Sequence, residues 1–321
     1  MSVDPSRNLH FPIEIPERPH RPRIIPVLLL HKGQLYKTVK FGDPKYVGDP
    51  RNAVRIFNDL GADELVLLDI DAAKKRNPPD LDLIEEIVSE AFMPVGYGGG
   101  ISDLGTARRI MRIGVEKIVL CTAAAHDSAL VEASSREFGA QSVVGCIDVR
   151  KQRGRNHRCF THSGGQKLSH DPIELASALV TAGAGEILVN SIDRDGTFEG
   201  YDLALLSEIA ESVSVPVIAC GGAGSYEDLG RAVHTAGASA AAAGSVFVFQ
   251  LPHRAVLITF PNEAERAELF PETFPAQLSA PQSESDEALK PAHSVPWQSG
   301  AVPTHFPERT GARAAVPYDR P

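Results

Sequence analysis

Residues 184–245 read AGEILVNSIDRDGTFEGYDLALLSEIAESVSVPVIACGGAGSYEDLGRAVHTAGASAAAAGS. The stretch contains three apolar runs, EILVNSI (186–192), PVIACGG (216–222) and SAAAAGS (239–245), each short enough for a buried strand. The two segments between these runs carry apolar residues at helical spacing. Short buried strands that alternate with helices are typical of parallel β/α units, so this stretch predicts a parallel sheet or barrel.

Small residues end the second and third of these runs. Gly221 and Gly222 close one run, and Gly244 and Ser245 close the other. Small residues at the C-terminal end of a strand let a bound group approach the backbone. Where a helix follows at once, its free N–H groups and positive dipole end favour a phosphate. The pattern therefore indicates a phosphate-binding edge.

The same alternation runs through the chain upstream. The further strand-length apolar runs are RIIPVLLL (23–30), ELVLLDID (64–71), MPVGYGGG (93–100), EKIVLCTAA (116–124) and QSVVGCIDV (141–149). Helical spacing separates them; for example, an apolar stripe that ends at Phe92 predicts a helix over residues 81–92. Eight strands alternating with helices predict an α/β protein with a single (β/α)8 TIM barrel over residues 23–261, rather than an open doubly wound sheet.

The segments outside this alternation differ in composition. Residues 1–22 are rich in proline, and we expect a disordered arm there. Residues 262–321 are rich in Pro, Ser, Ala and Glu, so we expect at most a short helix followed by a disordered tail. Two polar stretches inside the barrel region, 31–50 and 151–170, are expected to be long loops.

The barrel region is internally repeated. ADELVLLDID begins at Ala62 and AGEILVNSID begins at Ala184, 122 residues later, and the same offset relates PVGYGGG (94–100) to PVIACGG (216–222). A constant offset over several strands indicates two duplicated half-barrels. The duplication predicts two phosphate cradles, one over strands three and four and one over strands seven and eight. A ligand with a phosphate at each end would span the mouth of the barrel.

The composition sets further limits. The chain has 321 residues, 43% hydrophobic residues and a formal net charge of −9, which argues against a general nucleic-acid or membrane-surface binder. The four cysteines form no CxxC pair, so their spacing predicts neither a disulfide nor a metal site. We expect no cofactor. Because the chain shows neither an apolar signal core nor a membrane-length apolar run, we expect a cytoplasmic protein.

A set of motifs follows in order along residues 23–249: RIIPVLLL, DELVLLDID, GGGI, CIDV, GAGEILVNSIDRDGT, GYD and IACGGAG. Together they resemble the HisF family, the cyclase subunits of imidazole glycerol phosphate synthase. The resemblance implies a duplicated half-barrel that pairs with a HisH-like glutaminase. It further implies that ammonia enters at the N-terminal face, crosses the barrel core and meets a bis-phosphate substrate at the C-terminal face.

The resemblance places the two phosphate sites of the family on this chain. The second site falls on Gly196, Gly222, Gly244 and Ser245, and the first falls on Gly100, Cys121 and Thr122. Cys121 stands where an asparagine is usual in the family. The structural alternative for the glycines is tight turns and close helix packing. Two symmetric copies at strand ends favour a phosphorylated small-molecule ligand instead.

The resemblance also implies two catalytic aspartates, on strands one and five, that act as general acid and base in ring closure. The strand-five aspartate matches Asp148 in CIDV. The strand-one aspartate falls on Leu29 in PVLLLHKG. Leucine cannot transfer a proton, so the sequence predicts a broken catalytic pair.

Four charged residues match the ring that closes the ammonia entrance in the family. They are Arg23, Glu64, Lys117 and Glu186, and each stands at the start of its strand. Strand starts in a parallel barrel lie at one end, so we expect these side chains to converge. The alternative to an ammonia gate is a structural salt-bridge plug, since buried charges need partners.

Further charged residues follow the strands at the opposite end. Asp69, Asp71, Asp193 and Asp195 come after strands two and six, where they either orient a polar substrate or cap the following loops. Lys37 lies in the basic loop after strand one and is interpreted as a mobile phosphate lid or as a solvated lysine.

The segments PVLLL, KTVKF and FGDPKYVGDP are similar to HisF-like proteins found with a HisH-like glutaminase and a third protein, an amidotransferase of bacterial surface-polysaccharide synthesis. That resemblance implies ammonia delivery for converting an acetamido sugar to an acetamidino sugar, with the amidination on the third protein. The alternative is the true cyclase subunit of L-histidine biosynthesis. A phosphosugar isomerase on a duplicated half-barrel is a third interpretation, and the SIDRDGT string and the charged ring count against it.

Overall fold

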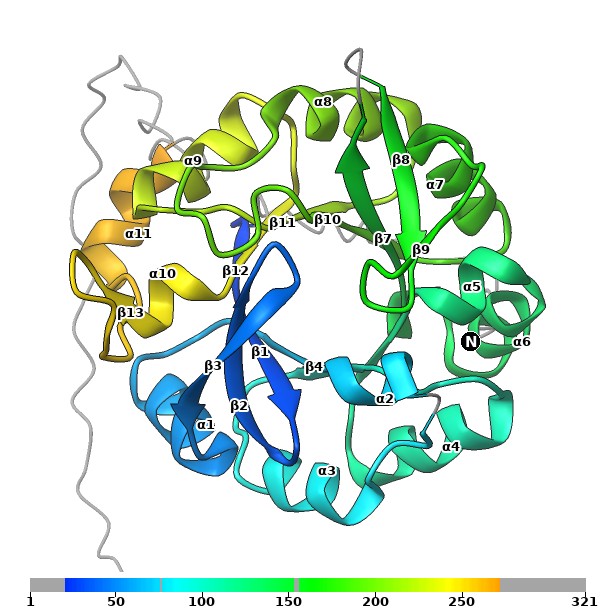
Figure 1. Ribbon diagram of the computed structural model, residues 1–321, viewed down its shortest axis with the longest axis horizontal. Coiled ribbons are helices and arrows are strands. Elements are labelled where there is room, and N and C mark those ends of the chain that lie inside the picture. The colour runs from blue at the N-terminus through cyan, green and yellow to red at the C-terminus, as the bar shows by residue number, and fades with distance from the viewer. Residues whose placement is uncertain (1–20, 76, 153–155, 272–321) are drawn as a thin grey trace, which may run out of the picture. The chain divides into compact units, whose positions relative to one another are not determined.

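Eight parallel strands close into a ring in the computed structural model, which describes residues 21–75, 77–152 and 156–271 (Figure 1). The ring consists of β1 (Arg23–His31), β4 (Leu65–Asp69), β5 (Val95–Gly98), β6 (Lys117–Leu120), β7 (Val143–Lys151), β10 (Glu186–Ser191), β11 (Val217–Cys220) and β12 (Ala240–Ala243). It closes because β1 pairs with both β12 and β4, and β10 pairs with both β7 and β11. The predicted (β/α)8 barrel is confirmed.

Helices surround this ring (Figure 1). The longer ones are α1 (Pro50–Asp59), α3 (Leu81–Val88), α4 (Leu104–Ile113), α6 (Ala129–Phe138), α7 (Pro172–Thr181), α8 (Leu203–Ser212) and α9 (Tyr226–His234). Shorter ones are α2 (Ile70–Lys75), α5 (Thr122–His126), α10 (Ser245–Val248), α11 (Glu263–Leu269) and the 3-10 turn η1 (Ala140–Ser142). Aspartate side chains begin α1, α3, α4, α7 and α8 by accepting a backbone N–H of the first turn. Such caps satisfy donors that the helix itself leaves free.

The strand side chains alternate between two apolar layers. On β1, Ile25, Val27 and Leu29 belong to the layer inside the barrel, whereas Ile24 and Leu28 belong to the layer between strands and helices. The alternation follows from the two-residue period of a strand. It means that every second residue of a strand faces the barrel axis, from one end of the ring to the other.

The repeated segments occupy equivalent places in the ring. Around the barrel, β4, β5 and β6 stand four strands away from β10, β11 and β12. The repeat at residues 62–71 contributes β4, and the repeat at residues 184–193 contributes β10. This spacing is what two half-barrels related by a quasi-two-fold axis require.

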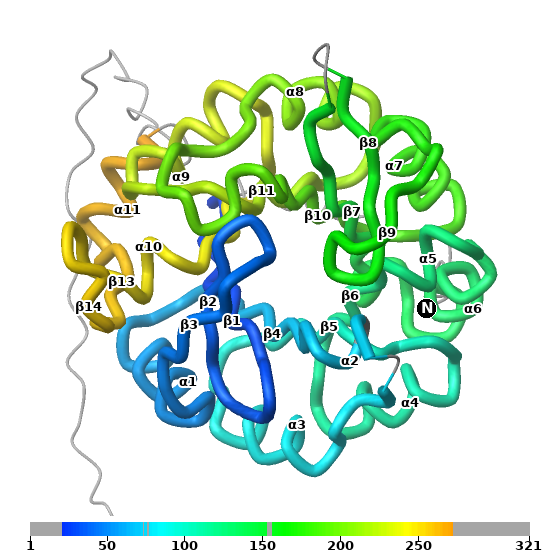
Figure 2. Tube along the Cα trace, in the orientation of Figure 1, coloured from blue at the N-terminus to red at the C-terminus, as the bar shows by residue number. Residues whose placement is uncertain are grey.

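Two hairpins replace the long loops expected over residues 31–50 and 151–170. β2 (Gln34–Val39) pairs with β1 and with β3 (Gly42–Gly48), and β8 (His157–Thr161) pairs with β7 and β9 (Gln166–Lys167). The glycines and prolines suggested loops, but antiparallel pairing with a neighbouring barrel strand satisfies the backbone of these segments. Figure 2 traces both hairpins over the ring, the first in blue and the second in green.

The expected helix over 81–92 is four residues too long. α3 ends at Val88, and Phe92 is 90% exposed instead of belonging to the apolar stripe. The side chain of Asn58 accepts the N–H of Phe92 and donates to the carbonyl of Glu90, which turns the chain. Pro94 also disfavours helical backbone at the residue before it. The loop leads directly into the N-terminal end of β5.

The end of the described chain packs on the barrel. A third small hairpin, β13 (Phe249–Gln250) with β14 (Ala255–Val256), follows α10, and α11 begins at the capping box of Asn262 and Glu265. Arg266 on α11 donates to the carbonyl of Gly61 and to Asp63. The disordered arm and tail expected at the two ends lie almost wholly outside the described residues. Within the described ranges, every helix is too short or too polar to span a membrane.

Candidate functional site

A cavity of about 910 Å³ opens where the barrel strands end. It is lined by residues that follow the C-terminal ends of strands on both halves of the ring. The six residues predicted to bind phosphate, Gly100, Thr122, Gly196, Gly222, Gly244 and Ser245, all line it. The structure therefore brings the two predicted cradles to a single cavity, as a ligand with two anionic ends would need.

Two of these glycines allow the β2–β3 hairpin to approach closely. Gly196 has φ +70, and a Cβ there would collide with the carbonyl oxygen of Thr38. A Cβ on Gly244 would collide with the ammonium group of Lys37. A Cβ at position 196 would push the hairpin backbone away, whereas a Cβ at position 244 would displace the end of the Lys37 side chain.

Lys37 is buried within the cavity wall, contrary to the expectation of a mobile or solvated side chain. Its ammonium group donates to the carbonyl of Val27. Burial lowers the pKa of Lys37 to about 8, although the charge of nearby Asp195 opposes the shift. Burial likewise raises the pKa of Asp195, whose carboxylate accepts a hydrogen bond of 2.9 Å from Thr38. Lys37 and Asp195 thus place an ammonium group and a carboxyl group beside the second predicted cradle.

Asp148 lies on β7 with its side chain toward the cavity. Asn190 donates to its carboxylate at 3.4 Å, and the thiol of Cys121 donates at 3.5 Å. Burial raises the pKa of Asp148 to about 7. A carboxyl group that titrates near neutrality can both give and take a proton, which is the property a general acid or base needs.

Leu29 lines the same cavity from β1. It packs with the apolar layer inside the barrel and stands beside Leu68 of β4 in the strand register. The structure therefore places Leu29 at the barrel interior, where it supplies a hydrocarbon surface. Asp148 keeps its place on the other side of the ring without a carboxyl group at position 29.

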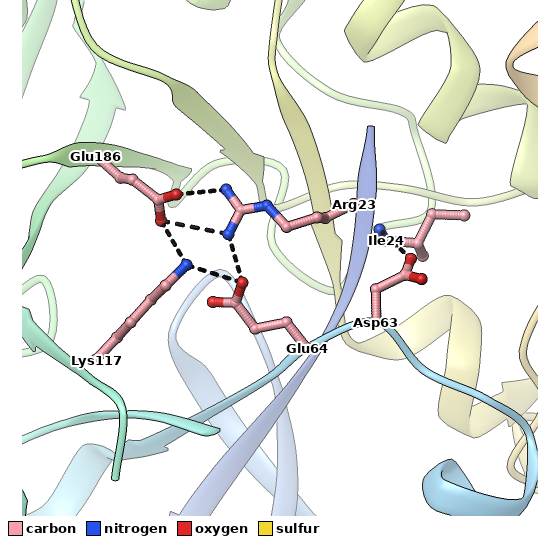
Figure 3. A network of polar contacts seen from close by, with 6 residues as sticks. All are labelled: Arg23, Ile24, Asp63, Glu64, Lys117 and Glu186. Carbon is pink, nitrogen blue, oxygen red and sulfur yellow. Dashed lines mark hydrogen bonds and ion pairs between the residues drawn. The ribbon is translucent and has the colours of Figure 1, made fainter. Parts of the chain in front are cut away.

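The four ring residues converge at the opposite end of the barrel (Figure 3). The guanidinium of Arg23 lies between two carboxylates: it donates to Glu64, and its Nη2 lies 2.6 Å from Glu186. The ammonium of Lys117 lies 2.9 Å from Glu64 and 3.0 Å from Glu186. Two cations and two anions thus form a closed cycle in which every charge has two opposite neighbours.

The cycle is a neutral and largely buried assembly. Glu64 is the most buried member, with 4% of its side chain exposed, whereas 27% of the Arg23 side chain is exposed. Burial by itself would lower the pKa of Arg23, but the attraction of Glu64 and Glu186 outweighs burial and raises it. Asp63 extends the contact by accepting the backbone N–H of Ile24 (Figure 3).

Apolar side chains of the described barrel strands face the axis between the charged ring and the cavity. This section of the interior layer consists of Ile25, Val27, Val66, Val119, Val144, Leu188, Ile218, Ala240 and Ala242. Such a section binds no ion, because an unpaired charge in hydrocarbon surroundings carries a large desolvation cost. Neutral molecules do not bear that cost.

Comparison with known proteins places the chain in a family. The family model for histidine biosynthesis proteins matches residues 23–251. A Pseudomonas aeruginosa protein named "Putative imidazole glycerol phosphate synthase subunit hisF2" is 52% identical over 242 residues, which are 75% of this chain and 96% of that protein. The chain belongs to the HisF family.

Other HisF-family relatives cover a similar share of the barrel. A Vibrio vulnificus protein named "Putative imidazole glycerol phosphate synthase subunit hisF3" is 47% identical over 247 residues, which are 77% of this chain and 95% of that protein. The "Imidazole glycerol phosphate synthase subunit HisF" of Exiguobacterium sibiricum is 43% identical over 225 residues, which are 70% of this chain and 90% of that protein. The predicted family membership is confirmed.

Sequence reasoning missed several polar groups of the cavity in this HisF-family barrel. Asn190 contacts Asp148, yet its own Oδ1 is buried without a hydrogen-bond partner. Cys146 lies two residues before Asp148 on the same face of β7 and also contacts it. The two-residue spacing to Asp148 and the equivalent place of Asn190 on the next strand were signals that could have identified both.

Proposed function

We propose that this chain is the synthase-type subunit of a glutamine amidotransferase. It receives ammonia from a HisH-like glutaminase at the charged ring and conducts it through the barrel to the cavity. The acceptor is then an acetamido sugar of surface-polysaccharide synthesis, converted to an acetamidino sugar on a third protein. The observation that carries this proposal is Leu29, which replaces the strand-one acid by an apolar surface while the rest of the path is retained.

The apolar section of the barrel supports conduction of ammonia itself. Free ammonia is neutral, so it crosses the section between the ring and the cavity without the desolvation cost that ammonium would bear. In this proposal the ring is the gate. Lys117 swings away from the two carboxylates to open a passage, and the three remaining charges keep their mutual contacts.

An exposed aromatic residue supports a partner at the gated end. Phe92 is 90% exposed and lies in the loop before β5, at the same end of the strands as the ring. Buried aromatic anchors contribute strongly to protein interfaces. We therefore place Phe92 in the contact with the glutaminase.

The second candidate is the true imidazole glycerol phosphate synthase cyclase of L-histidine biosynthesis. Asp148 favours it, because its pKa of about 7 suits proton transfer. The two sets of cradle residues at one cavity favour it as well. Against it stands Leu29, because ring closure by paired acid and base groups lacks the second group.

A cyclase assay separates the two candidates. The full chain is mixed with ammonia and the bis-phosphate ribulosyl substrate, and formation of imidazole glycerol phosphate is followed. We expect no turnover from the wild type, and a gain of activity in Leu29→Asp. Wild-type turnover at ordinary enzyme rates would refute the ammonia-delivery proposal.

The partner is tested separately. Glutamine hydrolysis by a HisH-like glutaminase is measured as a function of barrel concentration. We expect Phe92→Ser to weaken the stimulation by about tenfold or more in the barrel concentration required. Tyr46→Ser is the matched control, because Tyr46 is 54% exposed but lies on β3 of the hairpin at the opposite end. Equal effects of the two variants would exclude Phe92 from the interface.

A further inference from the structure

Two thiols and a carboxyl group meet at the end of the barrel interior. The sulfur atoms of Cys121 and Cys146 and a carboxylate oxygen of Asp148 all lie within 4.8 Å of one another. Within the described residues, this is the group of three such side chains whose ligand atoms come close enough to share an ion. We propose that Cys121, Cys146 and Asp148 bind one zinc ion.

The backbone presents these three groups together. β6 and β7 are parallel neighbours whose register pairs Leu120 with Gly145, so the next residues, Cys121 and Cys146, stand side by side. Asp148 follows Cys146 by two positions on β7 and therefore faces the same side of the strand. Cys146 and Asp148 lie on β7, and Cys121 directly follows the last residue of β6, at the start of α5.

The separations of the donor atoms are close to those around a tetrahedral ion. With Zn–S bonds of about 2.3 Å and Zn–O bonds of about 2.0 Å, sulfur and oxygen ligands stand about 3.5 Å apart. In the structure, Cys121 Sγ lies 3.5 Å from Oδ2 of Asp148, and Cys146 Sγ lies 4.0 Å from Oδ1. The first separation matches, but the second is to the other carboxylate oxygen, so binding requires the Asp148 carboxylate and the Cys146 side chain to rotate until one oxygen stands near both sulfurs.

The donor set selects the metal. Calcium and magnesium take oxygen ligands, so two thiolates argue against either ion. An iron–sulfur cluster is held by four cysteines, and this group has two. Zinc accepts sulfur and carboxylate together in a tetrahedral arrangement. On binding, each thiol loses its proton to solvent, forming one Zn–S bond per sulfur, and the carboxylate contributes the third bond.

Three protein ligands leave one position of a tetrahedron open. All three residues line the cavity, so a water molecule or a cavity ligand takes the fourth position. The bound ion with two thiolates and one carboxylate carries a net negative charge of one. The buried ammonium of Lys37 lines the same cavity and provides a compensating positive charge. The site is independent of the proposed ammonia delivery.

Cobalt reports the ligands directly. The full chain, freed of metal with a chelator and kept reduced, is titrated with Co²⁺. We expect a thiolate-to-cobalt charge-transfer band in the near ultraviolet that saturates at one cobalt per chain and is abolished by added Zn²⁺. Absence of this band overturns the proposal, because cobalt bound by histidines and carboxylates alone does not produce it.

Variants locate the band. We expect Cys121→Ser and Cys146→Ser each to remove most of it and to weaken zinc binding at least a hundredfold. Cys159→Ser is the matched control, because Cys159 is buried on β8 but does not line the cavity. A band that survives both cluster variants, or that is lost equally in the control, refutes this assignment.

A measurement on the wild type avoids any folding defect of the variants. Alkylation of each cysteine is followed by mass spectrometry with and without zinc. We expect zinc to slow the modification of Cys121 and Cys146 at least tenfold and to leave Cys220 unchanged. Cys220 lines the same cavity but stands outside the cluster. Equal protection of all three thiols, or of none, overturns the proposal.

Discussion

Replacing Glu64 by glutamine tests whether the charged ring behaves as a buried cycle. Glu64 accepts from both Arg23 and Lys117, and only 4% of its side chain is exposed. Glutamine keeps the shape of the side chain but removes its charge. Arg23 and Lys117 then share Glu186 as their only carboxylate within the ring, and the ring gains a net positive charge.

The size of the effect follows from the burial of the partners. Removing one member of a buried ion pair costs about 3–5 kcal/mol, because the other charge is left uncompensated. Here Glu186 still contacts both cations, and the side chains of Arg23 and Lys117 are 27% and 16% exposed, so solvent screens part of the loss. We expect the free energy of unfolding to fall by about 2–3 kcal/mol. For a domain of this size that corresponds to a decrease in Tm of roughly 5–10 °C.

Urea unfolding followed by far-ultraviolet circular dichroism is the suitable assay. The single tryptophan, Trp297, lies outside the described residues, so the backbone signal is followed instead of fluorescence. Glu90→Gln is the matched control, because Glu90 lies in the turn after α3 and pairs at the surface with the exposed Arg55, so its loss should change stability little.

A double variant sharpens the same test. Glu64→Gln combined with Lys117→Met restores a neutral ring, so part of the lost stability should return. The buried-cycle interpretation is refuted if the double variant loses as much free energy of unfolding as Glu64→Gln and Lys117→Met lose together. It is also refuted if Glu64→Gln loses no more than Glu90→Gln.

Three further variants probe the cavity, all measured with a chelator present. Burial raises the pKa of Asp148 from 3.8 to about 7, so the folded state holds its proton longer than the unfolded state and stability falls as pH rises through this window. Asp148→Asn should remove that decline, and an unchanged pH profile of unfolding would contradict the assigned burial. Burial lowers the pKa of Lys37 from 10.5 to about 8, so stability should rise with pH between these values and Lys37→Met should abolish the rise in the same unfolding series. Gly222 has φ +118, and a Cβ there would collide with the carbonyl oxygen of Gly200. Gly222→Ala should therefore destabilise the chain more than Gly237→Ala, whose Cβ has room, and should weaken inorganic phosphate binding in calorimetry.

Much of the barrel could be predicted because its signals are local. A buried strand needs only a short apolar run, and a helix needs only its spacing and a cap. The ring of charges was predictable for the same reason. Arg23 and Lys117 begin their strands, and parallel strands of a closed barrel start at one end, so their side chains had to meet.

Other features depended on contacts between distant segments. The helix ending at Val88 carries an apolar stripe that continues to Phe92 in the sequence, and the hydrogen bonds of Asn58 from another helix help to end it. The β2–β3 hairpin was expected as a loop, because its pairing partner is a barrel strand and its residues include glycine and proline. The conformational propensities of the residues in the two segments carry no information about Asn58 or about strand β1, with which these segments form their hydrogen bonds.

The sequence by itself determined the barrel, its duplication, the charged ring and the apolar residue at position 29. Each of these features follows from the types of the residues and from their spacing along the strands. Only the tertiary structure decided that Lys37 is buried beside Asp195, since a flexible side chain on a hairpin can face solvent or cavity alike. Only it brought Cys121 beside Cys146, 25 positions later in the chain, to meet Asp148. Linear spacing puts Cys146 and Asp148 on one face of a strand but gives no sign of Cys121, because the register between two strands is a property of the fold.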